Sequence, residues 1–110
     1  MAIELTHQNA GVVQVAVRDD MTIYTALEQK RQLFAYLTAA RRLQIDLGGV
    51  TEIDGAGVQL LMFLKREALV HHIDLSLARH SRAVVEALEL LNLGKYFGDP
   101  IVMAAGWKPS

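Results

Sequence analysis

The sequence predicts a single α/β domain, with a mixed sheet of four or five strands and three or four helices packed mainly on one face. Residues 43–47 and 73–77 both alternate apolar and polar side chains, which is the period of a half-buried strand. Residues 56–72, between them, have the length of a helix that joins parallel neighbours. One polar face on each strand indicates a sheet that is open to water on the side without helices.

The first part of the chain is predicted to form a β-hairpin and then a helix. Residues 12–17 are rich in β-branched side chains and are expected to pair with residues 3–7 across a turn at 8–11. Thr25 and Glu28 have the spacing of a capping box, so the helix is expected to begin at Thr25. Its helically spaced side chains are Leu27, Arg31, Phe34 and Leu37.

A third helix and a short edge strand are predicted to follow the strand at 73–77. Ser81 is the expected N-cap, and Gly94 stands where the helix is expected to stop. The apolar stripe of this helix consists of Val84, Leu88 and Leu91. Residues 99–105, "DPIVMAA", are expected to add an edge strand.

Composition favours one folded domain over residues 1–110. Hydrophobic residues make up 52% of the 110 residues and charged residues 21%, with only two prolines, which is typical of a compact fold. The ends at 1–2 and 106–110 are expected to be flexible.

The same composition excludes several classes of function. The 11 basic and 12 acidic residues are scattered and give a formal net charge of −1, so nucleic acid is not an expected partner. Without cysteine there is no disulfide, thiolate nucleophile or sulfur metal site. The apolar run at 60–64 is far shorter than the ~20 residues that cross a membrane, and no signal peptide is visible. We expect a cytoplasmic chain without membrane insertion and without a cofactor.

Asp54 stands where the strand-ending loop meets the crossover helix. Its carboxylate suits the free N–H groups and the positive dipole at a helix start, so Asp54 is predicted to be the N-cap. Gly55 and Gly57 remove side chains from this turn, which permits unusual backbone geometry or close approach by another molecule. From these residues alone, a plain turn and a docking site both remain open.

The stretch "IDLGGVTEIDGAGVQLL", residues 45–61, resembles the signature of the STAS domains, named for sulfate transporters and antagonists of anti-sigma factors. That signature has a strand ending in Asp-Leu, a Gly-Val turn, then Asp followed by Ser or Thr, a small residue and Gly. The resemblance extends over residues 21–37 and 80–102, and it is greatest to small stand-alone bacterial members, including some linked to chemotaxis and signalling.

The resemblance implies a module that binds a regulatory protein, often a GHKL-type kinase that doubles as an anti-sigma factor. In the family, phosphorylation of a Ser or Thr at the start of the crossover helix breaks the complex. Gly55 and Ala56 match those positions, and neither can carry a phosphate. The usual switch is therefore expected to be absent. Thr51 is the nearest remaining hydroxyl and is interpreted first as an ordinary turn threonine.

The crossover helix is more apolar than one buried face requires. Leu60, Leu61, Leu64 and Ala68 share the predicted core arc, and Val58, Met62 and Leu69 form a second stripe. Phe63 and Val70 lie on a third side, next to Gln59 and Arg66. Full burial and contact with a partner both explain such a helix. The predicted docking face comprises Asp54, Gly55, Ala56, Gly57, Val58, Gln59, Met62, Phe63 and Arg66.

Enzymatic functions lack their necessary groups in this sequence. His71 and His72 would point about 100° apart on a helix, and no spaced partner completes a metal site, so they are interpreted as helix-end residues. His7 and His80 are expected to be solvated or to cap a helix. Ser81 lacks a nucleophile elbow, and the glycine-rich residues 48–57 lack the Lys-Ser/Thr ending of a P-loop. We therefore expect no catalysis.

Two other functions stay as alternatives. Some STAS-like subunits dock on ABC-type ATPases of lipid transport and support their assembly, and the "AGVQLL" helix resembles those too. A nucleotide-binding protein or small hydrolase is the less favoured alternative.

Overall fold

The computed structural model describes residues 3–91, which form a four-stranded sheet with three helices. The strands are β1 (Ile3–Asn9), β2 (Val12–Met21), β3 (Arg42–Ile53) and β4 (Asp74–Ala78), in the sheet order β1-β2-β3-β4. The helices are α1 (Ala26–Thr38), α2 (Gly55–Val70) and α3 (Arg82–Leu90). The predicted α/β class is confirmed.

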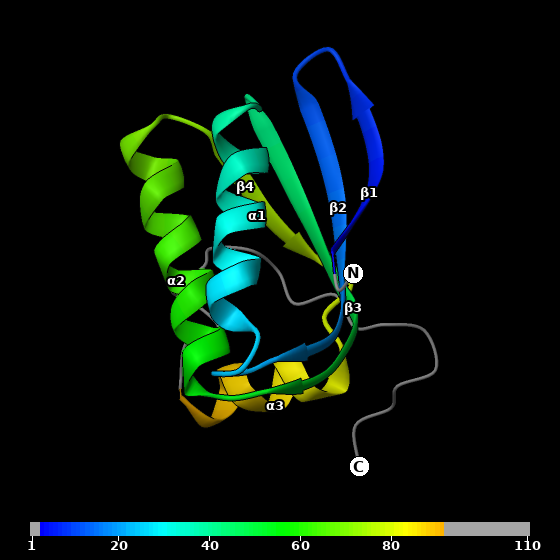
Figure 1. The fold of residues 1–110 in the computed structure, drawn as a ribbon, viewed down its shortest axis with the longest axis vertical. Helices are drawn as coiled ribbons and strands as arrows, with labels where there is room; N and C mark the ends of the chain where they lie inside the picture. Colours follow the sequence, from blue (N-terminus) through cyan, green and yellow to red (C-terminus); the bar gives the residue numbers. More distant parts are fainter. Residues whose placement is uncertain (1–2, 92–110) are drawn as a thin grey trace.

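The connections make the sheet mixed, as predicted. β1 and β2 form an antiparallel hairpin, whereas β2 pairs with β3 and β3 with β4 in parallel. Each parallel pair is joined by a crossover helix, α1 for the first and α2 for the second. Figure 1 shows α1 and α2 side by side over one face of the sheet, with α3 at the end where β3 runs into α2.

The core lies between the sheet and the two crossover helices. The sheet contributes Val13, Val15, Val17, Leu43, Ile45, Leu47, Leu75 and Leu77, all buried. The predicted core arc of α2, Leu60, Leu61, Leu64 and Ala68, is buried against them and is thereby confirmed. Because side chains alternate along a strand, the residues between these apolar ones are placed on the opposite face.

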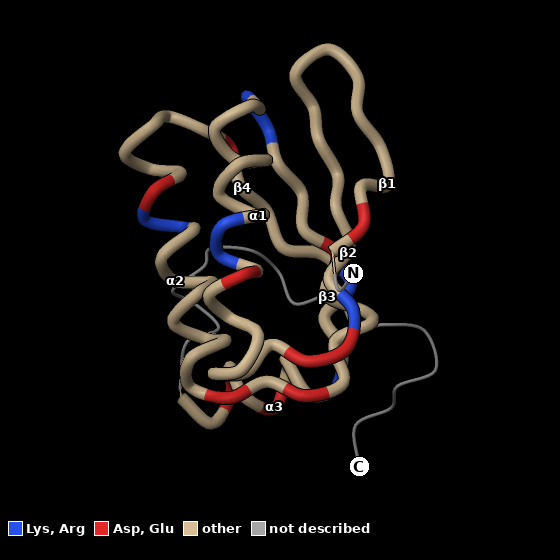
Figure 2. Tube along the Cα trace, viewed as in Figure 1, with Lys and Arg blue, Asp and Glu red and all other residues tan. Residues whose placement is uncertain are grey.

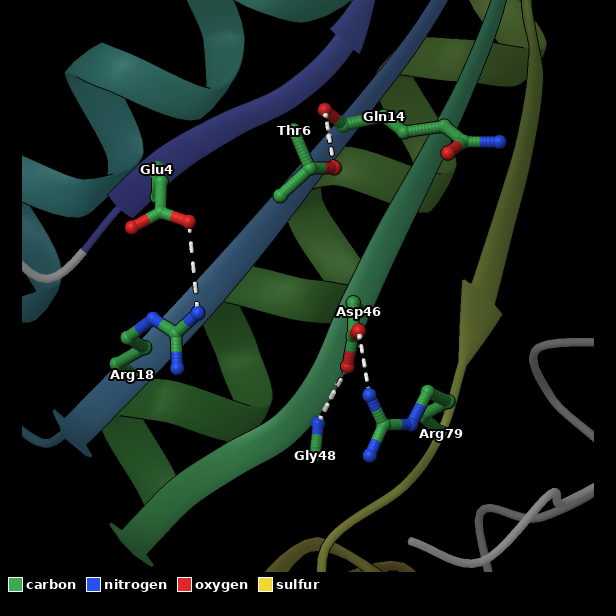
Figure 3. Close-up of polar contacts among 7 residues, drawn as sticks. All are labelled: Glu4, Thr6, Gln14, Arg18, Asp46, Gly48 and Arg79. Carbon is green, nitrogen blue, oxygen red and sulfur yellow. Dashed lines mark hydrogen bonds and ion pairs between the residues drawn. The ribbon is translucent and has the colours of Figure 1, made fainter.

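That opposite face is polar and remains partly exposed, as predicted (Figure 3). Arg18 pairs with Glu4 at 3.4 Å and Arg79 pairs with Asp46 at 3.5 Å, while the Thr6 hydroxyl donates to the backbone carbonyl of Gln14 at 3.0 Å. Exposed pairs of this kind contribute little to stability. Their effect is to keep one face of the sheet hydrophilic.

β2 and β3 are longer than predicted. β2 continues to Met21, and β3 runs through Gly48 and Gly49 to Ile53, where the sequence analysis expected a glycine-rich turn. β2 and β3 stay paired to their ends because the register between them shifts twice, between Ala16 and Arg18 and again between Asp19 and Asp20. Such irregularities bend strands and interrupt their alternation, which hides them from a search for period two.

The start of α1 is at Ala26, with Thr25 as its N-cap residue, but the predicted capping box is absent. The Thr25 hydroxyl makes no capping bond. It accepts from the N–H of Thr22 at 3.0 Å and lies 3.0 Å from the carbonyl of Asp20, to which it donates. The Glu28 carboxylate pairs with Arg31. Thr25 therefore ties the helix start to the end of β2.

The buried face of α1 also differs from the predicted stripe. Gln29, Leu33 and Leu37 are buried, whereas Leu27 is 81% exposed and Arg31 is exposed as well. Helical spacing placed Leu27 and Leu37 on one side, but the packing of α1 against the sheet and α2 selects a face rotated away from Leu27.

The boundaries of α2 and the start of α3 lie within two residues of the predicted ones, whereas α3 ends at Leu90, before the stop predicted at Gly94. α2 begins at Gly55 and ends at Val70, against a prediction of 56–72. Ser81 caps α3 as predicted, its hydroxyl accepting from the N–H of Val84 at 3.2 Å. Leu91, predicted on the buried stripe, follows the helix end and is 50% exposed. Gly94, the strand at 99–105 and both predicted flexible ends lie outside the described residues.

Gly57 permits a close approach of α2 to the ends of β2 and β3. A Cβ at this position would overlap the backbone carbonyl oxygen of Met21 and lie 2.8 Å from Cγ1 of Ile53. At Gly55, by contrast, no atom lies within 4 Å of such a Cβ. The two glycines of this turn therefore have different roles: Gly57 allows close packing, and Gly55 leaves open space.

Substitution of the two glycines tests this difference. Gly57→Ala is expected to destabilise the fold by about 1–3 kcal/mol, because the new methyl group meets a backbone atom that cannot rotate away. Gly55→Ala is the matched control and is expected to be neutral or stabilising by up to about 1 kcal/mol, since it raises helix propensity without a clash. Urea unfolding measures both, and equal stabilities for the two variants would contradict the packing role of Gly57.

Candidate docking site

Asp54 joins two segments that are far apart in the sequence. It is the N-cap of α2, as predicted: its Oδ1 accepts from the N–H groups of Ala56 at 2.9 Å and Gly57 at 3.1 Å. Its Oδ2 accepts from the N–H of Ile23, in the loop between β2 and α1, at 3.0 Å. The N–H of Asp54 itself donates to the carbonyl of Met21. One side chain therefore holds the start of α2 against the β2–α1 loop.

These hydrogen bonds lower the pKa of Asp54 below its ordinary value. The largest cause is the N–H of Ile23, and the N–H groups of Gly57 and Ala56 act in the same direction, since each favours the charged carboxylate. The negative charge also suits the positive end of the α2 dipole. Because Asp54 already occupies these donors, the start of α2 does not offer them to a phosphate of a nucleotide.

A groove between α1 and α2 opens beside this turn, with a volume of ≈ 490 Å³. We call it the α1–α2 groove, and it is lined by Ala26, Leu27, Lys30, Ala56, Gln59, Leu60, Met62, Phe63 and Arg66. The Phe63 ring packs on that of Phe34 with 5.9 Å between centroids. The ammonium of Lys30 lies 4.3 Å from the centroid of the Phe63 ring, and the guanidinium carbon of Arg66 lies 5.8 Å from it. These distances allow cation–π attraction.

Basic and acidic segments both occur on this side of the molecule. Figure 2 shows a basic segment next to an acidic one on each of α1 and α2, and further acidic segments along the ends of β2 and β3. The groove thus has a basic wall on each helix, and its lining includes no carboxylate.

The structure brings together most of the predicted docking residues. Ala56, Gln59, Met62, Phe63 and Arg66 line the α1–α2 groove. The exposed Gly55 and the half-exposed Asp54 belong to the turn at the start of α2. Gly57 and Val58 do not join this surface, because both are buried, Val58 with 3% exposure.

The α1 wall was missing from the sequence-based docking face. Leu27 and Lys30 line the groove, yet Leu27 was assigned to an apolar stripe because of its spacing. A usable signal existed, since Ile23, Tyr24 and Leu27 place three large apolar side chains before and within the first turn of α1. All three are exposed.

The remaining candidate residues lie apart from the groove. Thr51 is exposed on β3, and its hydroxyl lies 3.5 Å from Oδ1 of Asp20. His71 is the C-cap residue of α2, which agrees with its interpretation as a helix-end residue, and His72 follows it with φ 57°. His80 was expected to be solvated or to cap a helix, but it is 2% exposed, and the N-cap of α3 is its neighbour Ser81. Residues 3–91 contain no group of three potential metal-ligating side chains.

The order of strands and helices, with a capped turn after the central strand, is matched by a known family. Residues 5–103 match the family model described as "Mlab, STAS domain". The chain belongs to the STAS domain family.

Several solved structures share this fold. An anti-sigma factor antagonist from Mycobacterium paratuberculosis is 21% identical with a TM-score of 0.75, over 94% of this chain and 87% of that one. A putative anti-sigma factor antagonist from Thermotoga maritima is 16% identical with a TM-score of 0.78, over the same shares of the two chains. The Bacillus cell fate determinant SpoIIAA, in its phosphorylated form, is 13% identical with a TM-score of 0.69, over 93% and 92%.

None of the helices within residues 3–91 has the length and apolar character required to span a bilayer.

Asp54→Asn tests the electrostatic part of the Asp54 contacts. A lowered pKa contributes stability above the ordinary aspartate value of 3.8, and this stability is lost as the pH falls through the folded-state pKa. We expect the native chain to be more stable than Asp54→Asn at pH 7 and the difference to shrink below about pH 4. Urea unfolding of both chains between pH 7 and pH 2.5 measures this, and a difference independent of pH would contradict the charged N-cap.

Proposed function

We propose that this STAS domain is a non-enzymatic, cytoplasmic regulatory module that docks a protein partner through the α1–α2 groove and the adjoining turn at Gly55. The observation that carries the proposal is the groove itself, which exposes apolar and basic side chains beside the turn where relatives carry their regulatory hydroxyl. A surface of this kind is suited to a protein partner. The preferred partner is a GHKL-type kinase or anti-sigma factor, or a chemotaxis-linked signalling protein.

Control of this partner is proposed to differ from that of phosphorylated relatives. At Gly55 the space is open and a side chain would be exposed, so the fold could accept a serine there. A phosphate on such a serine would bring about two negative charges next to the carboxylate of Asp54. With Gly55 and Ala56 in these positions, the complex is not broken in this way, and its partner is either permanently engaged or regulated elsewhere.

The same feature supports the second candidate, a STAS subunit of an ABC-type lipid transport ATPase. A subunit that supports assembly of an ATPase has no need of a phosphorylation switch, so the absence of a hydroxyl at positions 55 and 56 suits it. Both candidates use one docking surface, and they differ in the protein that it binds.

Affinity capture from a lysate of the source cells tests the docking surface. Gln59→Trp places a bulky uncharged side chain at an exposed position of the groove and is expected to reduce recovery of the specific partner at least about tenfold, because it obstructs the groove. Leu69→Trp adds the same side chain on α2 outside the groove lining, where Leu69 is 70% exposed, and is expected to leave recovery unchanged. Circular dichroism checks the folding of both variants, and mass spectrometry identifies the bound proteins.

The identity of the recovered protein separates the candidates. A kinase or anti-sigma protein supports the signalling module, and a transporter ATPase supports the second candidate. Equal recovery by the native chain and by the folded Gln59→Trp variant would contradict the proposed surface.

A phosphorylation assay tests the proposed absence of the regulatory phosphorylation site at positions 55 and 56. Incubation of the native chain with source-cell lysate and labelled ATP is expected to leave residues 48–57 unmodified, because Gly55 and Ala56 have no hydroxyl and Thr51 lies on a strand. Gly55→Ser provides the matched comparison, since it adds a hydroxyl in open space. Mass spectrometry locates any phosphate, and a phosphate on Thr51 of the native chain would overturn this part of the proposal.

A further inference from the structure

The geometry points to an acidic segment of a protein as the occupant of the α1–α2 groove. In this arrangement an apolar side chain of the partner packs against the apolar lining beside Phe63, and carboxylates on either side of it pair with Lys30 and Arg66. The inference rests on the proposed function, since it specifies the chemistry of the partner at the same surface.

The charges of the groove are complementary to carboxylates. Lys30 on α1 and Arg66 on α2 both lie over the Phe63 ring, and within the described part of the chain neither forms an ion pair. The neighbouring Arg31 is paired with Glu28. Two cations without a carboxylate partner, on opposite walls of one groove, favour an acidic partner and disfavour a basic one.

The apolar side chains of the groove indicate that the partner segment carries an apolar residue as well as carboxylates. Leu60, Met62 and Phe63 contribute the apolar side chains of α2 to the groove lining, and Leu27 of α1 lines it while 81% exposed. Large apolar side chains gathered beside cations are typical of surfaces that bind an aromatic or aliphatic anchor flanked by polar contacts. An acidic segment without an apolar residue would leave this lining uncovered.

The loop before α1 extends the same surface. Ile23 is 70% exposed and Tyr24 is 94% exposed, and the bond from the N–H of Ile23 to Asp54 holds this loop to the start of α2. A partner longer than one anchor residue can therefore continue from the groove onto Ile23 and Tyr24.

A protein segment fits this surface better than a small anion. Asp54 takes up the N–H groups of Ala56 and Gly57, so the helix start presents a carboxylate where a phosphate would need donors. The lining contains three polar side chains, and all of them are exposed: Lys30, Gln59 and Arg66. Sites for small ligands instead enclose most of the ligand and orient it with convergent polar groups.

A peptide-display selection on the folded chain tests the inference. Peptides from a random library that bind the native chain are expected to carry Leu, Phe or Trp flanked by Asp or Glu. The double variant Lys30→Glu/Arg66→Glu is expected to bind these peptides at least about tenfold more weakly and to select peptides flanked by Lys or Arg instead. Both substituted positions are exposed, and circular dichroism verifies that the variant folds.

A matched double variant controls for net charge. Arg18→Glu/Arg82→Glu changes the charge by the same amount on the open sheet face and on α3, and it is expected to retain the native peptide preference. Selection of the same peptides by the native chain and by Lys30→Glu/Arg66→Glu would overturn the inference, as would no enrichment at all. Saturable binding of laurate in the groove, mapped by NMR, without enriched peptides would replace it with a small anionic amphiphile.

The outcome is separable from that of the cellular capture. If Gln59→Trp abolishes recovery of a protein whose binding is insensitive to Lys30→Glu/Arg66→Glu, the proposed docking surface is supported and the inferred acidic partner is contradicted. If acidic peptides bind in the groove but Gln59→Trp recovers every cellular partner normally, the proposed function is contradicted at this surface.

Discussion

The carboxylate of Asp54 is the contact on which the candidate site depends. It accepts N–H groups from the first turn of α2 and from Ile23 in the β2–α1 loop, so it links the segments from which both walls of the groove extend. Gly57 complements it, because only a residue without a side chain lets α2 approach the carbonyl of Met21 so closely. The position of the groove relative to the sheet therefore follows from two residues of one turn.

The groove combines buried apolar, exposed apolar and positively charged side chains in one lining. Its lining joins the hydrophobic core at Leu60 and reaches water at Leu27, with Phe63 half-buried between two cations. The charged groups of Lys30 and Arg66 both lie over the Phe63 ring, so cations and apolar side chains adjoin within one lining. Such a surface presents apolar area and charge together.

Local patterns in the sequence were sufficient for much of the fold. Alternation identified β3 and β4, apolar spacing identified the core arc of α2, and the capping positions of Asp54 and Ser81 followed from side-chain chemistry. The extension of β3 to Ile53 could not be predicted in the same way, because it depends on register shifts against β2, a distant segment. For the same reason only the α2 wall of the groove was predicted: which face of α1 is buried is decided by tertiary packing, and that packing exposes Leu27.

The open space around Gly55 has a consequence for the evolution of regulation in this fold. A single nucleotide change converts some glycine codons into serine codons, and no atom within 4 Å of the added carbon opposes it. Natural selection can therefore add or remove a hydroxyl group here without a steric clash in the fold. Gly57, in the same turn of helix, has no such freedom, because an added carbon there would overlap the carbonyl oxygen of Met21.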